Sequence, residues 1–382
     1  EANGTLAMTM ADATGTDDSL TINVLANNGD GDVDMILSLS DVENVTIAVN
    51  AGTKDVEIDM DLVTATSVTI TGGKDGELLS LANASGNEEL ASVTTTFDAS
   101  AFLGTIDVEL ANAASATTIK ANGASSVAHA ILGSAKADAI TLVGFTAATE
   151  VINGGASASD TLTFGAKNGF ANAGSITNVE TITMDVKAGD DVTLTTGFTD
   201  AEINTITVTG GNSLSTFTNP TDLVTGLLTY DATAFGGNSL IGFAAGLMDN
   251  TVNVKAGSLA TDQVSGIFTT DAASTSFNMS GVEKVKVVTT DFAGTFDVSG
   301  AVGMTNFIVS GVASSNTAAD IITVDELTSS HTVDLLILDL EDTLELKLVD
   351  ETGLADSVNL SLSGAAETGA TIKTTDIETV NI

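Results

Sequence analysis

The densest group of possible metal ligands lies near the start of the sequence, where acidic residues alternate with glycine. Residues 28–34 read NGDGDVD, and the oxygen-bearing side chains among them are Asn28, Asp30, Asp32 and Asp34. Calcium prefers a shell of about six to eight oxygen ligands and takes them from flexible loops of this kind. We interpret residues 28–34 as a calcium-binding loop. The alternative is a solvated turn, in which the repulsion among three nearby carboxylates is relieved in some other way.

Other acidic positions form weaker calcium candidates. Residues 155–162 read GASASDTL and residues 133–140 read GSAKADAI, and both keep the register of the glycine-rich nonapeptide that binds calcium in parallel β-rolls. Both have lost glycines, and the second carries a lysine. Pairs of adjacent acids stand at two expected turns. The additional candidate ligands are Asp17, Asp18, Asp160, Asp190 and Asp191. The alternative for each is a carboxylate that is solvated and binds no ion.

Residues for catalysis are scarce. The two histidines, His129 and His331, each stand alone, and the chain has no cysteine to act as a thiol nucleophile. No G-x-S-x-G turn marks a serine nucleophile. A rival interpretation is a parallel β-helix enzyme that acts on acidic polysaccharide, but such chemistry needs a cationic group to neutralise the substrate. Paired carboxylates for glycoside hydrolysis stay open, although acids are too numerous to single out a pair. We expect that the protein is not an enzyme.

The charge balance limits the possible partners. The 382 residues include 51 acidic and 11 basic side chains, all of the latter lysine, and the formal net charge is −40. Nucleic acid and anionic membrane surfaces both require a cationic face, so we exclude them as partners. A chain this negative repels itself unless cations neutralise it. The composition therefore implies divalent metal, high ionic strength, or both.

The elements that must position these residues are strands. Apolar residues alternate with polar ones over four to six residues, and each run is bounded by Gly, Asn, Asp or Ser. Hydrophobic residues make up 43 % of the chain but aromatic residues only 4 %, so the core must be built from small and β-branched side chains. A single proline fits stacked coils, which would lose ladder hydrogen bonds to it.

One repeated pattern places a glutamate inside an alternating apolar run. It occurs at residues 41–47 (DVENVTI), 178–184 (NVETITM), 281–287 (GVEKVKV) and 376–382 (DIETVNI). Because side chains alternate along a strand, we expect each glutamate to lie in a strand and point outward. The residues expected to share its outward face are Val45, Ile182, Val285 and Val380, and those expected to point inward are Val42, Val179, Val282 and Ile377.

Further landmarks recur at irregular distances. The segment 68–72 (VTITG) matches 206–210 (ITVTG), and 97–102 (FDASAF) matches 230–235 (YDATAF). An acid starts several strands, at Asp18, Asp160, Asp342 and Asp356. We therefore expect an all-β fold, an elongated parallel β-solenoid (β-helix) with degenerate repeats. It should run continuously over residues 1–382, with 150–160 and 265–280 as the places where it could bend or divide.

No apolar run approaches the length of a membrane span, and the sequence starts at Glu1 without Met and without an apolar signal segment. Because the sequence ends inside an expected strand, we interpret the chain as processed or as a fragment.

Residues 160–164, 177–182 and 97–102 resemble segments of calcium-dependent surface-layer and related RTX-type proteins of Gram-negative bacteria, although no nonapeptide is intact. The resemblance implies a β-solenoid that binds calcium as its cofactor, assembles with itself into a lattice or filament on the cell exterior, and is exported by type I secretion. The expected function is a structural surface-layer protein, with cell-surface polysaccharide as a further candidate partner. The alternative is a β-solenoid adhesin or biofilm-matrix protein that binds glycan or another cell.

Overall fold

The computed structural model describes residues 4–9, 15–25, 33–50, 56–63, 65–74, 77–81, 93–110, 113–122, 129–146, 151–167, 176–190, 193–194, 203–211, 215–219, 229–243, 253–257, 261–268, 272–289, 293–311, 321–337, 343–349, 356–362, 371–375 and 377–382.

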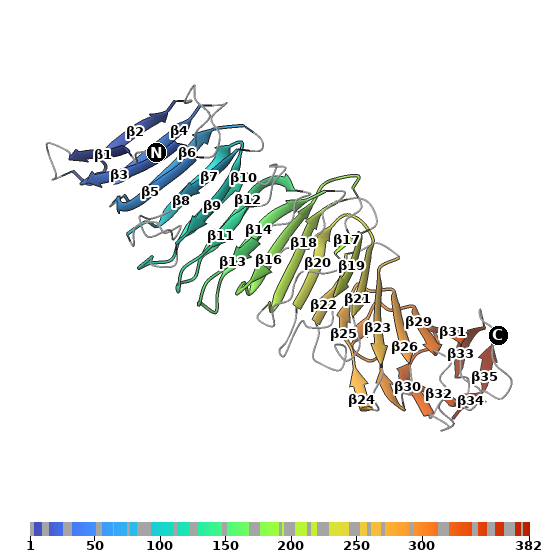
Figure 1. Ribbon diagram of the computed structural model, residues 1–382. Helices are drawn as coiled ribbons and strands as arrows, with labels where there is room; N and C mark the ends of the chain where they lie inside the picture. Colours follow the sequence, from blue (N-terminus) through green and yellow to red (C-terminus); the bar gives the residue numbers. More distant parts are fainter. Residues whose placement is uncertain are drawn as a thin grey trace. The chain divides into compact units, whose positions relative to one another are not determined.

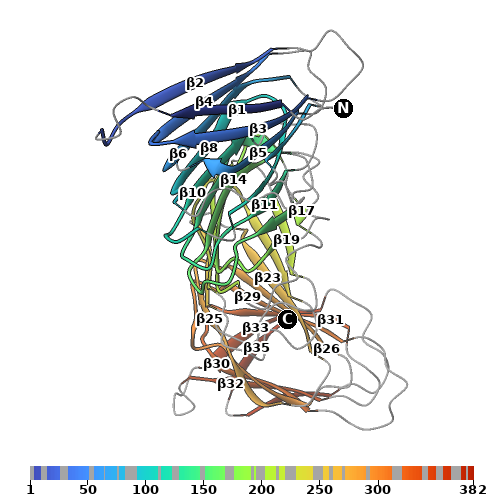
Figure 2. The same ribbon diagram turned by 60° about the vertical axis from the view of Figure 1, so that its left-hand side comes forward.

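The chain divides into two compact units. The first consists of residues 1–187 and 196–203, and the second of residues 188–195 and 204–382. All regular elements in the described part are strands, and every described pairing between neighbouring strands is parallel (Figures 1 and 2). No helix with the length and apolar character of a membrane span occurs among these residues. The places where the solenoid was expected to bend or divide, 150–160 and 265–280, stay predictions.

The first unit has two sheets, between which the chain passes alternately. One contains β1(Gly4–Thr9), β3(Val33–Ser40), β5(Val56–Val63), β7(Leu78–Leu81), β9(Thr105–Glu109), β11(Ala130–Leu132), β13(Val151–Asn153) and β15(Ile176–Thr177). The other contains β2(Ser19–Val24), β4(Asn44–Val49), β6(Ser67–Gly72), β8(Thr96–Phe102), β10(Thr118–Asn122), β12(Ala139–Thr146), β14(Thr161–Ala166) and β16(Thr181–Val186). Each coil of the chain thus adds one strand to each sheet, which is the arrangement of a β-solenoid.

The second unit has three sheets. The first contains β18(Thr205–Gly210), β20(Thr229–Phe235), β22(Asn253–Lys255), β25(Asn278–Ser280) and β28(Ala301–Val302). The second contains β17(Thr193–Leu194), β19(Ser215–Asn219), β21(Ser239–Phe243), β23(Gln263–Phe268), β26(Lys284–Thr289), β29(Asn306–Gly311), β31(Thr332–Ile337), β33(Ser357–Leu362) and β35(Thr379–Asn381). The third contains β24(Ala272–Ser276), β27(Gly294–Asp297), β30(Ile321–Leu327), β32(Thr343–Leu348) and β34(Thr371–Thr374). The expected all-β, parallel β-solenoid with degenerate repeats is confirmed.

The core of each unit consists of stacked rows of inward side chains. In the first unit the register places Val45, Val68, Phe97, Ile119 and Ile140 above one another, and all five are buried. Fully burying a side chain of this size contributes about 1.5–3 kcal/mol. The alternating polar residues face outward, as the period-two pattern predicts.

The second unit holds most of its described aromatic contacts in one cluster. Phe296 contacts Phe268 with ring centroids 4.9 Å apart, Phe277 at 6.0 Å and Phe307 at 5.8 Å. The cluster lies where three strands, rather than two, complete each coil, as in β23, β24 and β25. The rings of these coils thus pack against one another inside the second unit.

The expected placement of the repeated glutamates is wrong. Glu43, Glu180 and Glu283 do not lie in strands; each directly precedes one. Val42, Val179 and Val282 point inward as expected, but Val45, Ile182 and Val285 are buried too. The alternation breaks because the residue two places before each glutamate has a positive φ, 58° at Asp41, 52° at Asn178 and 69° at Gly281. This left-handed residue turns the chain at the corner of the coil, so the strand alternation starts afresh after the glutamate.

Candidate metal centres at the coil corners

The repeated glutamates form one half of an acid pair at the corner between successive coils. The carboxylate of each accepts a hydrogen bond from the backbone N–H of an aspartate one coil earlier. The four pairs and their N···O distances are Asp18 and Glu43 (2.8 Å), Asp160 and Glu180 (2.5 Å), Asp262 and Glu283 (3.0 Å), and Asp356 and Glu378 (2.9 Å). The two members are 20 to 25 residues apart in the sequence. This separation of one coil is the signal by which the sequence could have revealed them.

At each of these corners a main-chain hydrogen bond also joins the two successive coils. The carbonyl of Asp262 accepts the N–H of Lys284 at 3.0 Å, and the carbonyl of Asp356 accepts that of Thr379 at the same distance. Equivalent bonds join Asn44 to Asp18 and Thr181 to Asp160. Each acid pair is therefore held in register by main-chain bonds, independently of any ion.

Several of these aspartates also have a buried carboxylate oxygen that accepts no hydrogen bond. Among the described residues this holds for Oδ2 of Asp18, Asp262 and Asp356. The Asp262 side chain is the most enclosed of the three, with 1 % of the residue exposed, and its other oxygen accepts the N–H of Ser239 at 2.6 Å. A buried anionic oxygen without a donor is costly unless a proton or a cation neutralises it.

Burial has a clear effect on the charge of one pair. It raises the pKa of the Asp262 carboxyl, and burial together with the nearby Asp262 charge raises the pKa of Glu283. Both pKa values rise because holding two neighbouring negative charges away from water is unfavourable in free energy. A bound cation would offset this cost; a proton on either carboxyl would do so as well.

The corner at Asp138 shows how the cost is avoided without an ion. Oδ1 of Asp138 accepts the N–H of Thr117 at 2.7 Å and hydroxyl bonds from Thr117 and Ser134, while Oδ2 accepts the N–H of Ser134 at 2.5 Å. The residue is only 1 % exposed, and both of its oxygens have donors. Residues 133–140, which keep the nonapeptide register, therefore contain a corner whose carboxylate is already satisfied.

The structure brings together only some of the candidate ligands expected from the sequence. Asp18 lies beside Glu43, and Asp160 lies between Glu180 and Asp138, whose N–H it accepts at 2.7 Å. Asp17 instead accepts a bond from the side-chain amide of Asn44 at 3.0 Å. Asp190 follows β16 at a turn.

The acidic loop near the start of the chain falls mostly outside the described residues. Asn28, Asp30, Asp32 and Asp191 lie outside them. Of Asp34 only the backbone is described, as part of β3, where it pairs with Glu57. In the described part of the chain, no three Asp, Glu or His side chains converge on one point as metal ligands. A corner ion would thus take two carboxylates and complete its shell with carbonyl oxygens or water.

His129 occupies a corner as an uncharged counterpart of these acids. It precedes β11, is 1 % exposed, and its Nδ1 accepts the N–H of Ile106 at 3.1 Å. Since Nδ1 is the acceptor, Nε2 carries the hydrogen and donates it to the carbonyl of Asn122 at 2.9 Å. His331 accepts the N–H of Thr328 within a turn, and burial lowers its pKa. Both rings therefore support the backbone at turns.

The FDAS-like segments form a second kind of aspartate cap, on the outward face. Oδ1 of Asp98 accepts the N–H and hydroxyl of Ser100, and Asp231 is bonded in the same way by Thr233. Burial alone would raise the pKa of Asp98, but the bonds from Ser100 and the neighbouring Lys120 outweigh it and lower the pKa. Asp297, with Ser299, is a third copy that the sequence comparison missed.

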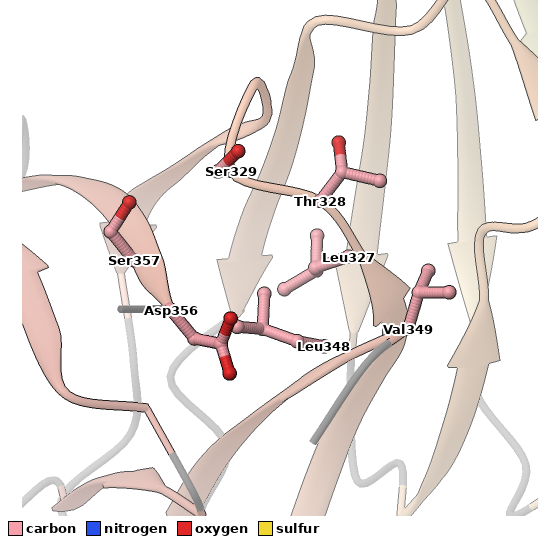
Figure 3. A pocket seen from close by; sticks show the side chains of 7 residues that line it. All are labelled: Leu327, Thr328, Ser329, Leu348, Val349, Asp356 and Ser357. Atoms are coloured by element: carbon pink, nitrogen blue, oxygen red, sulfur yellow. The ribbon is translucent and has the colours of Figure 1, made fainter. Parts of the chain in front are cut away.

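One corner has open space beside its acid. A cavity of about 220 Å³ lies next to Asp356, and Figure 3 shows the side chains that line it. Its lining residues are Leu327, Thr328, Ser329, Leu348, Val349, Asp356 and Ser357.

Comparison with known proteins gave no relatives: no family model, no curated protein and no solved structure matches the chain.

Proposed function

We propose that the chain is a structural surface-layer protein that assembles with itself into a calcium-dependent lattice on the cell exterior. The observation that carries the proposal is the recurring corner acid pair, whose aspartate has a buried, donor-free carboxylate oxygen at Asp18 and Asp262. A divalent cation would stabilise such a protein in two ways. It would neutralise the buried oxygens inside the coil, and it would reduce the repulsion of a formal charge of −40 at the surface.

The corner pairs would hold calcium within one molecule. Calcium accepts oxygen ligands of mixed type and tolerates irregular geometry, which suits two carboxylates supplemented by carbonyls and water. An ion that binds only the folded chain stabilises it by mass action. The pairs Asp18–Glu43 and Asp262–Glu283 would hold it, and the loop at 28–34 stays a separate predicted site.

Assembly requires a second effect, the neutralisation of charge between molecules. Monovalent salt screens repulsion beyond roughly 8 Å at physiological ionic strength, but it does not link carboxylates at contact distance. A divalent cation does both, since it takes ligands from each neighbour. Self-association should therefore need calcium and be reversed by chelation, and sodium chloride of equal ionic strength should not replace it.

The test combines light scattering with electron microscopy of purified protein. Wild type should form ordered sheets in calcium and none in chelator. The double variant Asp262→Asn and Glu283→Gln should bind fewer ions by calorimetry and lose calcium-dependent thermal stabilisation. Asp185→Asn, a single charge change on the exposed side of β16, serves as control. Sheets that persist in chelator, or an unchanged ion count in the double variant, would contradict the calcium mechanism.

The alternative function, a β-solenoid adhesin or biofilm-matrix protein, is favoured by the cavity beside Asp356, which offers room for a small group of a ligand. An adhesin would stay monomeric in calcium until its ligand is added, so the same scattering experiment separates the two functions.

A further inference from the structure

The cavity beside Asp356 is formed by two successive coils of the second unit. Leu327 ends β30 and is followed by the turn residues Thr328 and Ser329, whereas Leu348 ends β32. Asp356 and Ser357 stand at the start of β33. Figure 3 shows the Asp356 carboxylate beside Leu348, with the hydroxyls of Ser329 and Thr328 across the cavity. The described walls are thus aliphatic on one part and hydroxyl-bearing on another, and Asp356 is the acid among the described lining residues.

Asp356 forms no ion pair with a residue in the described part of the chain. The ion pairs there join Lys74 to Glu77, Lys120 to Asp98, and Lys255 to Asp231. Oδ2 of Asp356 is buried and accepts no hydrogen bond from a described residue, while its backbone N–H is bonded to Glu378. The Asp356 side chain also lines the cavity, so a cationic group placed there would offset a charge that no described ion pair balances.

The mixed aliphatic and polar walls of the cavity favour an organic cation over a metal ion. A calcium ion with its water shell needs about six to eight oxygens and gains nothing from aliphatic walls. A primary ammonium on a short alkyl stem uses both parts, because such stems lie along apolar surface while the charged end reaches a polar group. Its N–H groups only donate, so they suit the Asp356 carboxylate, which only accepts.

We propose that the cavity beside Asp356 is a binding site for a primary alkylammonium group. The alkyl stem packs on Leu327, Leu348 and Val349, and the ammonium donates to the Asp356 carboxylate. The group can be supplied by a free amine or by a lysine side chain of a second copy. The inference does not depend on the proposed lattice function, since it concerns the isolated chain.

Comparison with the other corners supports a ligand at this one. Asp138 has donors on both oxygens, so it offers no vacant place. Asp262 also has an oxygen without a donor, but only 1 % of the residue is exposed, so an organic ammonium with an alkyl stem cannot reach it. Asp356 combines a donor-free oxygen with a cavity and with partial exposure.

The experiment is calorimetric titration of n-butylammonium into the chain, in chelator to remove divalent ions. Asp356→Asn keeps the shape of the side chain and removes its charge, and we expect at least about tenfold weaker binding. Asp185→Asn makes the same charge change on the exposed side of β16 and should bind as wild type does. Butanol, with the same stem and no charge, should bind at least about tenfold more weakly than butylammonium.

Equal affinity of Asp356→Asn and wild type, or an equal loss in Asp185→Asn, would overturn the proposal, as would displacement of the amine by calcium at the same site. Circular dichroism confirms that both variants fold. The source of the ammonium follows from a second measurement on wild type, the concentration dependence of its mass in chelator. Dimers that butylammonium dissociates identify a lysine of a second copy, whereas a monomer that binds butylammonium identifies a free amine.

Discussion

Replacing Asp138 with alanine should destabilise the first unit strongly, and it should do so with or without calcium. The carboxylate lies at the corner before β12 and is almost fully buried. It accepts the backbone N–H groups of Thr117 and Ser134 and the hydroxyls of the same two residues. Alanine removes every one of these acceptors while leaving the donors buried.

The size of the effect follows from the donors left behind. A buried N–H without an acceptor costs about 1–3 kcal/mol, so two of them cost about 2–6 kcal/mol. The hydroxyls can rotate toward other acceptors and add less. An asparagine side chain in place of Asp138 would keep one acceptor oxygen, so Asp138→Asn should cost about half as much, roughly 1–3 kcal/mol.

Urea unfolding followed by circular dichroism measures both variants against Asp185→Ala, whose side chain is exposed. The unfolding midpoints should fall in the order wild type, Asp138→Asn, Asp138→Ala, by equal amounts in calcium and in chelator. An unfolding free energy for Asp138→Ala within about 0.5 kcal/mol of wild type would refute the hydrogen-bond account. A loss seen only in calcium would instead make Asp138 an ion ligand.

Two further predictions concern pH and the corner backbone. Burial raises the pKa of Asp262 above its ordinary 3.8, so its stabilising contribution is complete below pH 3.8 and is lost as pH rises through the raised pKa. The pKa of Asp297 is lowered, chiefly by Ser299, so its contribution is present above 3.8 and lost as pH falls through the lowered value. Urea titrations between about pH 3 and 7 measure both effects. Asp262→Asn should remove the part of the stability that wild type loses as pH rises, and Asp297→Asn the part that wild type loses as pH falls. At the corner, Asp41→Val should cost about 1–2 kcal/mol and Asp41→Gly nothing measurable, because Asp41 has a φ of 58°. Gly281→Ala should cost more than Asp41→Val, since its Cβ would lie 2.6 Å from the carbonyl oxygen of Gly257; equal midpoints would contradict this.

The sequence predicted the architecture because its main determinants are local. Alternation of apolar and polar residues identifies strands such as 68–72 and 206–210, and both end at a glycine of positive φ, Gly72 and Gly210. The rarity of proline and of large rings then favours stacked short strands. These features depend on a few neighbouring residues, so one sequence is enough to recognise them.

The corner pairs escaped prediction because they depend on the length of the coil. Asp262 meets Glu283 only because a sequence separation of 21 closes one complete coil, whereas the separation of Asp18 and Glu43 is 25. A coil of variable length has no fixed sequence period. Asp297 was missed for a simpler reason: Val298 and Gly300 stand where the other copies have alanine, although the Asp–Ser bond is kept.

The number of donors around a corner acid decides what that acid can do. Asp138 accepts hydrogen bonds on both oxygens, from Thr117 and Ser134. Its charge is therefore satisfied by bonds that join its own turn to the preceding coil. Asp262 receives a single bond, from the N–H of Ser239, and its second oxygen stays without a donor. The fold tolerates this because the main-chain bond from Lys284 to Asp262 keeps the corner in register. The same backbone frame thus supports two kinds of corner. The turn that brings the N–H of Ser134 onto the second oxygen of Asp138 makes that corner purely structural, whereas a corner without such a donor can take up a cation or a proton.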